Sequence, residues 1–86
     1  MVKQQVTVVN PTGLHARPAS QLITLCKGFA CSVKLISGGK TCDAKSIFSV
    51  MKCAIKQGSV IDVVCEGEGE AEALSTVVSF IESLTE

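Results

Sequence analysis

The sequence predicts an α+β fold in which a four-stranded, antiparallel-rich sheet carries three helices on one face. Three observations lead to this fold class. Alternating apolar residues mark four short strands, and apolar residues at helical spacing mark three helices. The two kinds of segment follow one another in the order β-α-β-β-α-β-α. No repeat, linker or low-complexity tract interrupts the chain, so we expect residues 1–86 to form one domain, an open-faced β-sandwich.

The first half of the chain predicts a strand, a helix and a hairpin. Val6 and Val8 alternate with polar residues, and the turn-forming segment 10–13 ends this first strand. A helix follows from near His15 to Gly28, because four apolar residues recur at helical spacing: Ala19, Leu22, Ile23 and Cys26. Residues 31–35 and 41–43 flank a glycine-containing turn, which is typical of a hairpin.

The second half predicts two further helices and one strand. A short helix is expected between Ser46, a good N-cap residue, and Gly58, with an apolar stripe of Ile47, Val50, Met51 and Ala54. Residues 61–65 alternate as the fourth strand, and the last helix presents Leu74, Val77, Val78 and Ile81 on one face. An acidic segment precedes this face and complements the helix dipole: Glu66, Glu68, Glu70 and Glu72. Because it lacks the ligand spacing of a hard cation site, no metal site is predicted.

The composition argues against several classes of function. The chain has 8 Lys plus Arg against 8 Asp plus Glu and only 3% aromatic residues, so it offers neither a basic nucleic-acid footprint nor a base-stacking platform. No apolar run approaches the ~18 residues of a membrane helix, and the first residues do not resemble a signal peptide. We therefore expect a cytoplasmic monomer without nucleic-acid or membrane partners. A chain of this length buries one core but no deep cleft, so any chemistry should lie near the surface.

The five cysteines have an odd count, irregular spacing and no C-x-x-C pair. This pattern suits reduced thiols better than a disulfide framework or a zinc site. Free cysteine behaves as a small buried apolar residue, so we expect most of these side chains in the core. The cysteines are Cys26, Cys31, Cys42, Cys53 and Cys65.

His15 is the candidate reactive residue. Histidine changes charge near physiological pH, and His15 stands at the start of the first predicted helix. The positive end of the helix dipole favours the neutral, nucleophilic imidazole, and the N–H groups of Ala16 and Arg17 can cradle an anion. The Arg17 guanidinium suits phosphate oxygens. Two interpretations stay open on this pattern: a phosphoryl group held on the imidazole, or a histidine that only caps the helix or lies in solvent.

Two segments around these residues resemble a known family. Residues 12–19, Thr-Gly-Leu-His-Ala-Arg-Pro-Ala, and residues 44–48, Ala-Lys-Ser-Ile-Phe, are similar to motifs of HPr, the histidine-containing phosphocarrier family of the bacterial sugar phosphotransferase system. The resemblance extends to length and element order. It implies that His15 accepts a phosphoryl group on Nδ1 from phosphorylated enzyme I and passes it to sugar-specific IIA components, while Arg17 assists by charge. It implies no cofactor and no independent enzymatic turnover.

The resemblance adds a second candidate site and a docking surface. In many Gram-positive members the residue matching Ser46 is phosphorylated by an ATP-dependent kinase, which is a regulatory alternative to a plain capping role. Four apolar residues would surround His15 as an exposed patch if the second helix lies beside the start of the first: Leu14, Ile47, Phe48 and Met51. Ile47 and Met51 have a second interpretation as core residues. We expect Val50 in the core and Phe48 at the surface.

Three functions therefore compete. The leading hypothesis is a phosphocarrier that uses His15 and Arg17. The alternative is a regulatory binding protein of carbon catabolite control that acts through Ser46, with a serine kinase/phosphorylase and a catabolite-control transcription factor as partners. A third, a thiol-based redox or metal module, is disfavoured because the cysteines are not paired along the sequence.

Overall fold

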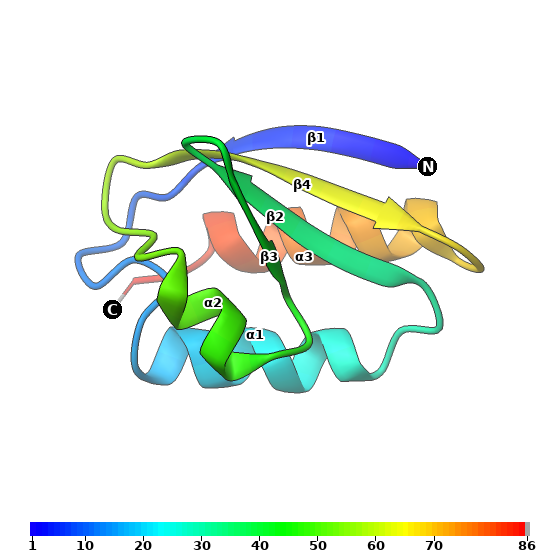
Figure 1. The fold of residues 1–86 in the computed structure, drawn as a ribbon, viewed down its shortest axis with the longest axis horizontal. Coiled ribbons are helices and arrows are strands. Elements are labelled where there is room, and N and C mark those ends of the chain that lie inside the picture. Colours follow the sequence, from blue (N-terminus) through cyan, green and yellow to red (C-terminus); the bar gives the residue numbers. More distant parts are fainter. Residues whose placement is uncertain (86) are drawn as a thin grey trace.

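The computed structural model describes residues 1–85 and has the predicted order of elements (Figure 1). The strands are β1 (Val2–Thr7), β2 (Ser32–Ser37), β3 (Lys40–Asp43) and β4 (Val60–Glu66). The helices are α1 (Arg17–Lys27), α2 (Ile47–Lys52) and α3 (Glu70–Glu82). The sheet has the order β1-β4-β2-β3, and every neighbouring pair is antiparallel. The predicted open-faced α+β sandwich is confirmed.

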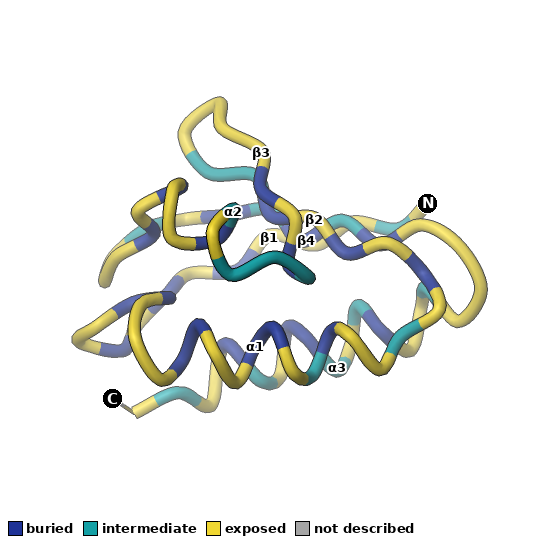
Figure 2. Tube along the Cα trace, turned by 60° about the horizontal axis from the view of Figure 1, so that its bottom comes forward, coloured by how far each residue is buried: buried dark blue, intermediate teal, exposed yellow. Residues whose placement is uncertain are grey.

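The three helices form the second layer of the molecule. Figure 1 shows α1 and α3 running beneath one face of the sheet, with α2 beside α1. In Figure 2 buried positions recur along α1 and α3 on the side that faces the sheet, and exposed positions lie on the outer side. The core is therefore a single apolar layer between sheet and helices.

The alternating strands supply the sheet side of this core. In β4 the buried residues are Ile61, Val63 and Cys65, and the residues between them are less buried. The antiparallel register sets Val63 opposite Leu35 of β2, so apolar residues of neighbouring strands face the same helices.

A two-residue turn joins β2 to β3. Gly38 and Gly39 have φ values of 55° and 83°, and these left-handed conformations match the twist of a tight hairpin. Ser37 pairs with Lys40 across the turn. The predicted hairpin is confirmed. Glycine suits this turn because it adopts two such conformations in succession without steric cost.

The predicted start of the first helix near His15 is confirmed to within two residues, and the predicted end of the second helix is wrong. α1 begins at Arg17, because Ala16 is the N-cap residue and has a φ of 55°, which is not helical. α2 ends at Lys52 rather than near Gly58. The chain leaves this helix through Ala54, which has a φ of 51°, so Ala54 does not extend the apolar stripe of α2.

All five cysteines are free and buried, as predicted. Burial raises the pKa of the Cys26 thiol to about 12 and that of Cys65 to about 11, because the thiolate loses its solvation in the core. These thiols therefore stay protonated at neutral pH and act as small apolar side chains. Among residues 1–85, no helix combines the length and the apolar character needed to span a membrane.

Candidate functional site

His15 lies exposed immediately before α1, and the chain turns into the helix at Ala16 and Arg17. Pro18 occupies the first turn, where the missing N–H costs no helical hydrogen bond. The first helical hydrogen bond here runs from the Ser20 N–H to the Ala16 carbonyl, at 3.2 Å. The positive end of the α1 dipole therefore lies beside the imidazole, as predicted.

Ala16 has a strained backbone at this position. Its φ of 55° and ψ of −125° lie outside the conformations that L-residues ordinarily adopt. Such strain costs about 1–3 kcal/mol and persists only where the surroundings hold it. Ala16 is thus fixed between the helix on one side and the anchored turn before His15 on the other.

The turn before His15 is held by a buried asparagine. The Asn10 side chain donates from Nδ2 to the Gly13 carbonyl at 2.8 Å, and the Gly13 N–H donates to the Asn10 carbonyl at 3.1 Å. Asn10 is the one polar residue in the buried set of the described chain. Because both bonds close the same four-residue turn, this segment is rigid rather than a free loop.

Gly13 also packs directly against the segment that follows α2. A Cβ atom at Gly13 would lie 2.4 Å from the Ile55 carbonyl oxygen and 2.5 Å from the Lys56 Cα. The next residue, Leu14, donates its N–H to the same Ile55 carbonyl at 3.0 Å. This backbone contact joins segments about forty residues apart. It needs glycine, because any side chain at position 13 would overlap backbone atoms.

The contact brings further side chains to His15. A small hollow of about 210 Å³ is lined by Thr12, His15, Ala54, Ile55 and Lys56. Thr12 and Lys56 are not among the site residues that the sequence predicts. The expected helix extended toward Gly58, whereas α2 ends at Lys52 and residues 54–56 line the hollow beside the histidine. Lys56 is the one cationic side chain among the residues that line this hollow, and Arg17 is not among them.

The residues of the predicted docking patch differ in exposure, and docking itself stays a prediction. Phe48 is 83% exposed and Met51 is 40% exposed, while Ile47 is half-buried and Val50 is buried. Leu14 requires a correction, because it is only 1% exposed and belongs to the core. Its backbone is tied to Ile55, and this bond turns the side chain inward. Since α2 packs against α1, the exposed apolar residues of α2 lie on the helix next to the one that His15 precedes (Figure 1).

Ser46 caps α2 as predicted. Its backbone is extended, with a φ of −127°, and its hydroxyl accepts a hydrogen bond from the Ser49 N–H at 3.4 Å. The side chain is half-buried. Within residues 1–85, no three potential ligand side chains come together to hold a metal ion.

Comparison with known proteins decides the family. A family model described as the PTS HPr component phosphorylation site matches residues 2–83. The chain belongs to the HPr family. It is 41% identical over 81 residues to the phosphocarrier protein HPr of Lysinibacillus sphaericus, covering 94% of this chain and 92% of that protein. It is 40% identical over 82 residues to the HPr-like protein Crh of Halalkalibacterium halodurans, covering 95% and 98% of the two chains.

A solved HPr structure has the same fold. The crystal structure of HPr from Thermoanaerobacter tengcongensis superimposes with a TM-score of 0.94 and 35% sequence identity, covering 96% of this chain and 93% of that one. The HPr likeness therefore extends from the motif around His15 to the whole arrangement of strands and helices.

The contact at Gly13 predicts a large loss of stability for Gly13→Ala in this HPr chain. The methyl group would overlap the Ile55 and Lys56 backbone, so we expect the free energy of unfolding to fall by about 3 kcal/mol or more. Urea unfolding followed by circular dichroism measures this change.

The matched control is Gly38→Ala. Gly38 also has a positive φ, of 55°, but nothing lies within 4 Å of its Cβ position. This variant should lose only the ~1–2 kcal/mol that an L-residue costs in the left-handed region. Equal losses in the two variants would show that the Gly13 contact is not close.

Proposed function

We propose that this chain is a phosphocarrier that accepts a phosphoryl group on His15 from phosphorylated enzyme I and passes it to sugar-specific IIA components. The observation that carries the proposal is an exposed histidine at the N-terminal end of α1, with Arg17 beside it, inside a match to the HPr phosphorylation-site family. A carrier must show the same atom to a donor and then to an acceptor. Exposure of His15 therefore suits this function, whereas an enclosed active site would not.

The chemistry needs a neutral imidazole and positive charge around the phosphoryl oxygens. Nδ1 of His15 attacks phosphorus and a P–N bond forms, while the bond that holds the phosphoryl group on enzyme I breaks. The transition state spreads negative charge over three oxygens, so catalysis depends on positioning and charge neutralisation. Arg17 and the N-terminal N–H groups of α1 supply this charge, and the partner protein supplies the rest of the site. The chain has no turnover of its own.

In this function the phosphoryl group on His15 occupies the hollow beside it. Lys56 brings a cation to the hollow and Thr12 brings a hydroxyl, and both kinds of side chain suit phosphate oxygens. The turn at Asn10 and Gly13 is rigid, so the segment that carries His15 does not have to reorganise during transfer.

The partners dock on α2 and the start of α1 in this proposal. Phe48, Met51 and Ile47 offer an apolar surface, and the flexible Met51 side chain adapts to differently shaped partners. In this function the carrier is a cytoplasmic monomer without a cofactor. Enzyme I and the IIA components bind it in turn.

The carrier function predicts an acid-labile adduct on His15. Incubation with phosphoenolpyruvate and enzyme I should add one phosphoryl group to the wild-type chain, and mild acid should remove it, because the P–N bond hydrolyses at low pH. Intact mass spectrometry before and after acid treatment measures both steps.

His15→Ala is the control for this experiment and should take up no phosphoryl group. An unmodified wild-type chain in the presence of active enzyme I would refute the carrier function. An adduct that survives acid, or that persists in His15→Ala, would place the phosphoryl group elsewhere.

The hollow predicts that Lys56→Gln slows phosphorylation of His15 by roughly threefold to tenfold, because one exposed cation contributes modestly to transition-state charge. The rate is measured by rapid quench with phosphorylated enzyme I, and again with phosphoramidate as a small donor that needs no docking. Lys56→Arg should retain most of the rate.

Lys34→Gln removes an equal charge on β2 and should leave both rates unchanged. If Lys56→Gln slows only the reaction with enzyme I, then Lys56 serves docking rather than the phosphoryl group. If neither rate changes, Lys56 has no role in transfer.

A second candidate function rests on Ser46. The chain is as similar to a Crh protein as to an HPr protein, and Ser46 caps the helix that carries Phe48. Phosphorylation by a serine kinase would set a dianion at the N-terminal end of α2, where the N–H groups accommodate it. The added charge would repel partners with acidic surfaces and could recruit a catabolite-control transcription factor.

Regulation through Ser46 predicts an acid-stable adduct after incubation with ATP and the serine kinase/phosphorylase. Ser46→Ala should abolish it, and phosphorylated chain should accept the phosphoryl group from enzyme I more slowly. Lack of any acid-stable adduct on folded wild-type chain would remove this second function and leave the carrier function intact.

A further inference from the structure

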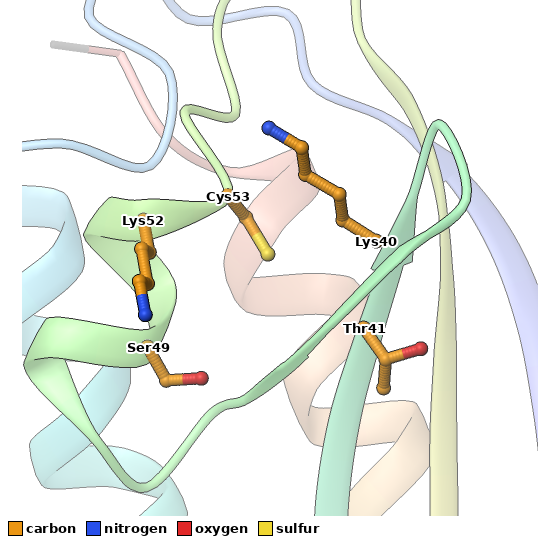
Figure 3. Close-up of a pocket in the computed structure, with 5 residues that line it drawn as sticks. All are labelled: Lys40, Thr41, Ser49, Lys52 and Cys53. Carbon is orange, nitrogen blue, oxygen red and sulfur yellow. The ribbon is translucent and has the colours of Figure 1, made fainter.

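A pocket lies between the edge strand β3 and the short helix α2 (Figure 3). It has a volume of about 400 Å³ and is lined by Lys40, Thr41, Ser49, Lys52 and Cys53. β3 is the last strand in the order β1-β4-β2-β3, so no other strand of residues 1–85 covers this side of it. None of the five lining residues takes part in the proposed transfer at His15.

The charged side chains of the pocket are both lysines. Lys40 and Lys52 form no ion pair and no side-chain hydrogen bond with the described residues of the chain. The neighbouring acidic residue, Asp43, does not line the pocket, and its carboxylate accepts a hydrogen bond from the Lys45 N–H at 2.9 Å. The pocket therefore presents two positive charges without an opposing carboxylate, which favours an anionic ligand.

Main-chain groups of β3 also face the pocket. The Ala44 N–H donates to the Val33 carbonyl of the neighbouring chain segment at 2.9 Å. The preceding N–H, of Asp43, points the other way and donates to Ser49 Oγ on α2 at 2.8 Å. Because the direction of these groups alternates along an antiparallel strand, the N–H and C=O of Thr41 also point toward α2. They offer one donor and one acceptor to a ligand.

The Ser49 hydroxyl adds a further donor. Its oxygen accepts the hydrogen bond from Asp43, so its own hydrogen is available to a ligand. In Figure 3 the Lys52 ammonium group lies on the Ser49 side of the pocket. The Lys40 side chain reaches in from β3 on the other side, with the Cys53 sulfur between the two lysines. Two separate anionic groups on one ligand match this arrangement better than a single small ion.

The C-terminal end of α2 opposes this positive charge only weakly. Carbonyl groups of a last helical turn carry the negative end of the helix dipole when they lack partners. Here the Val50 carbonyl accepts a hydrogen bond from the Cys53 N–H at 3.3 Å. The Met51 carbonyl accepts one from the Ala54 N–H at 3.1 Å. These carbonyls are therefore already bonded within the chain.

We propose that this pocket binds a small hydroxylated organic phosphate that carries a second acidic group, of the phosphoglycerate type. The phosphate contacts Lys52 and the Ser49 hydroxyl, and the second acidic group contacts Lys40. The main chain of Thr41 bonds a hydroxyl group of the ligand. Charge-assisted hydrogen bonds of this kind are stronger than neutral ones, and the volume of the pocket lies in the range of small-molecule sites.

The ligand would connect two segments that meet only in the fold, residues 40–41 of β3 and residues 49–53 at the end of α2. Binding would restrain α2 against the sheet and raise the melting temperature of the chain as the ligand concentration increases. α2 also carries the exposed Phe48, so the ligand would stiffen this surface without entering the hollow beside His15.

Titration of the full nitrogen-15-labelled chain with 3-phosphoglycerate tests the proposal by amide chemical shifts. We expect saturable shifts at Thr41, Ser49 and Lys52. Lys40→Gln and Lys52→Gln should each raise the Kd roughly twofold to fivefold, because one exposed charge pair contributes modestly. Glycerol 3-phosphate lacks the carboxylate and should bind the wild-type chain more weakly by a similar factor. Lys40→Gln should bind both ligands alike, since it lacks the partner of the carboxylate.

The matched control is Lys34→Gln, which removes an equal charge on β2 outside the pocket and should leave the Kd unchanged. Circular dichroism checks that each variant is folded. Absence of saturable shifts, or shifts confined to residues 12–17 at the start of α1, would overturn the pocket as a binding site. An unchanged Kd in both Lys40→Gln and Lys52→Gln would do the same. Equal binding of the two ligands to the wild-type chain would overturn the second acidic group.

Discussion

The site depends on one contact, the approach of Gly13 to the backbone of Ile55 and Lys56. The missing side chain lets two loops touch, and the hydrogen bond from Leu14 to the Ile55 carbonyl fastens them together. This fastening buries Leu14, presents His15 to solvent and brings Lys56 to the hollow beside it. Asn10 closes the turn from within. Without this contact the histidine would stand on a free loop, and any reaction at the imidazole would first have to order that loop.

The charges of the site are local, although the chain as a whole is neutral. A balance of 8 basic against 8 acidic residues hides a concentration of positive charge at the start of α1, formed by the helix dipole, Arg17 and Lys56. The strained Ala16 conformation lies at the same point. A small domain has little interior in which to enclose a reaction, so in the proposed function backbone geometry and a few surface cations take the place of a closed active site.

The cysteines divide by their surroundings rather than by their spacing. Cys26, Cys31 and Cys65 fill the layer between the sheet and the helices, where desolvation holds the thiols of Cys26 and Cys65 in the neutral form. Cys42 on β3 and Cys53 after α2 also pack as apolar side chains, and Cys53 lines a pocket together with Lys40 and Lys52.

Local patterns in the sequence determined the element order, the hairpin at Gly38 and Gly39, the Ser46 cap and the place of His15 at a helix start. These features depend on neighbours within a few residues, through side-chain periodicity, positive φ and capping hydrogen bonds. The resemblance to HPr motifs added the phosphoryl group. Only the tertiary structure decided that Leu14 is buried, that α2 ends at Lys52 and that Lys56 lines the hollow beside His15. Each of these follows from packing between separate segments, and such contacts leave no periodic trace in the sequence.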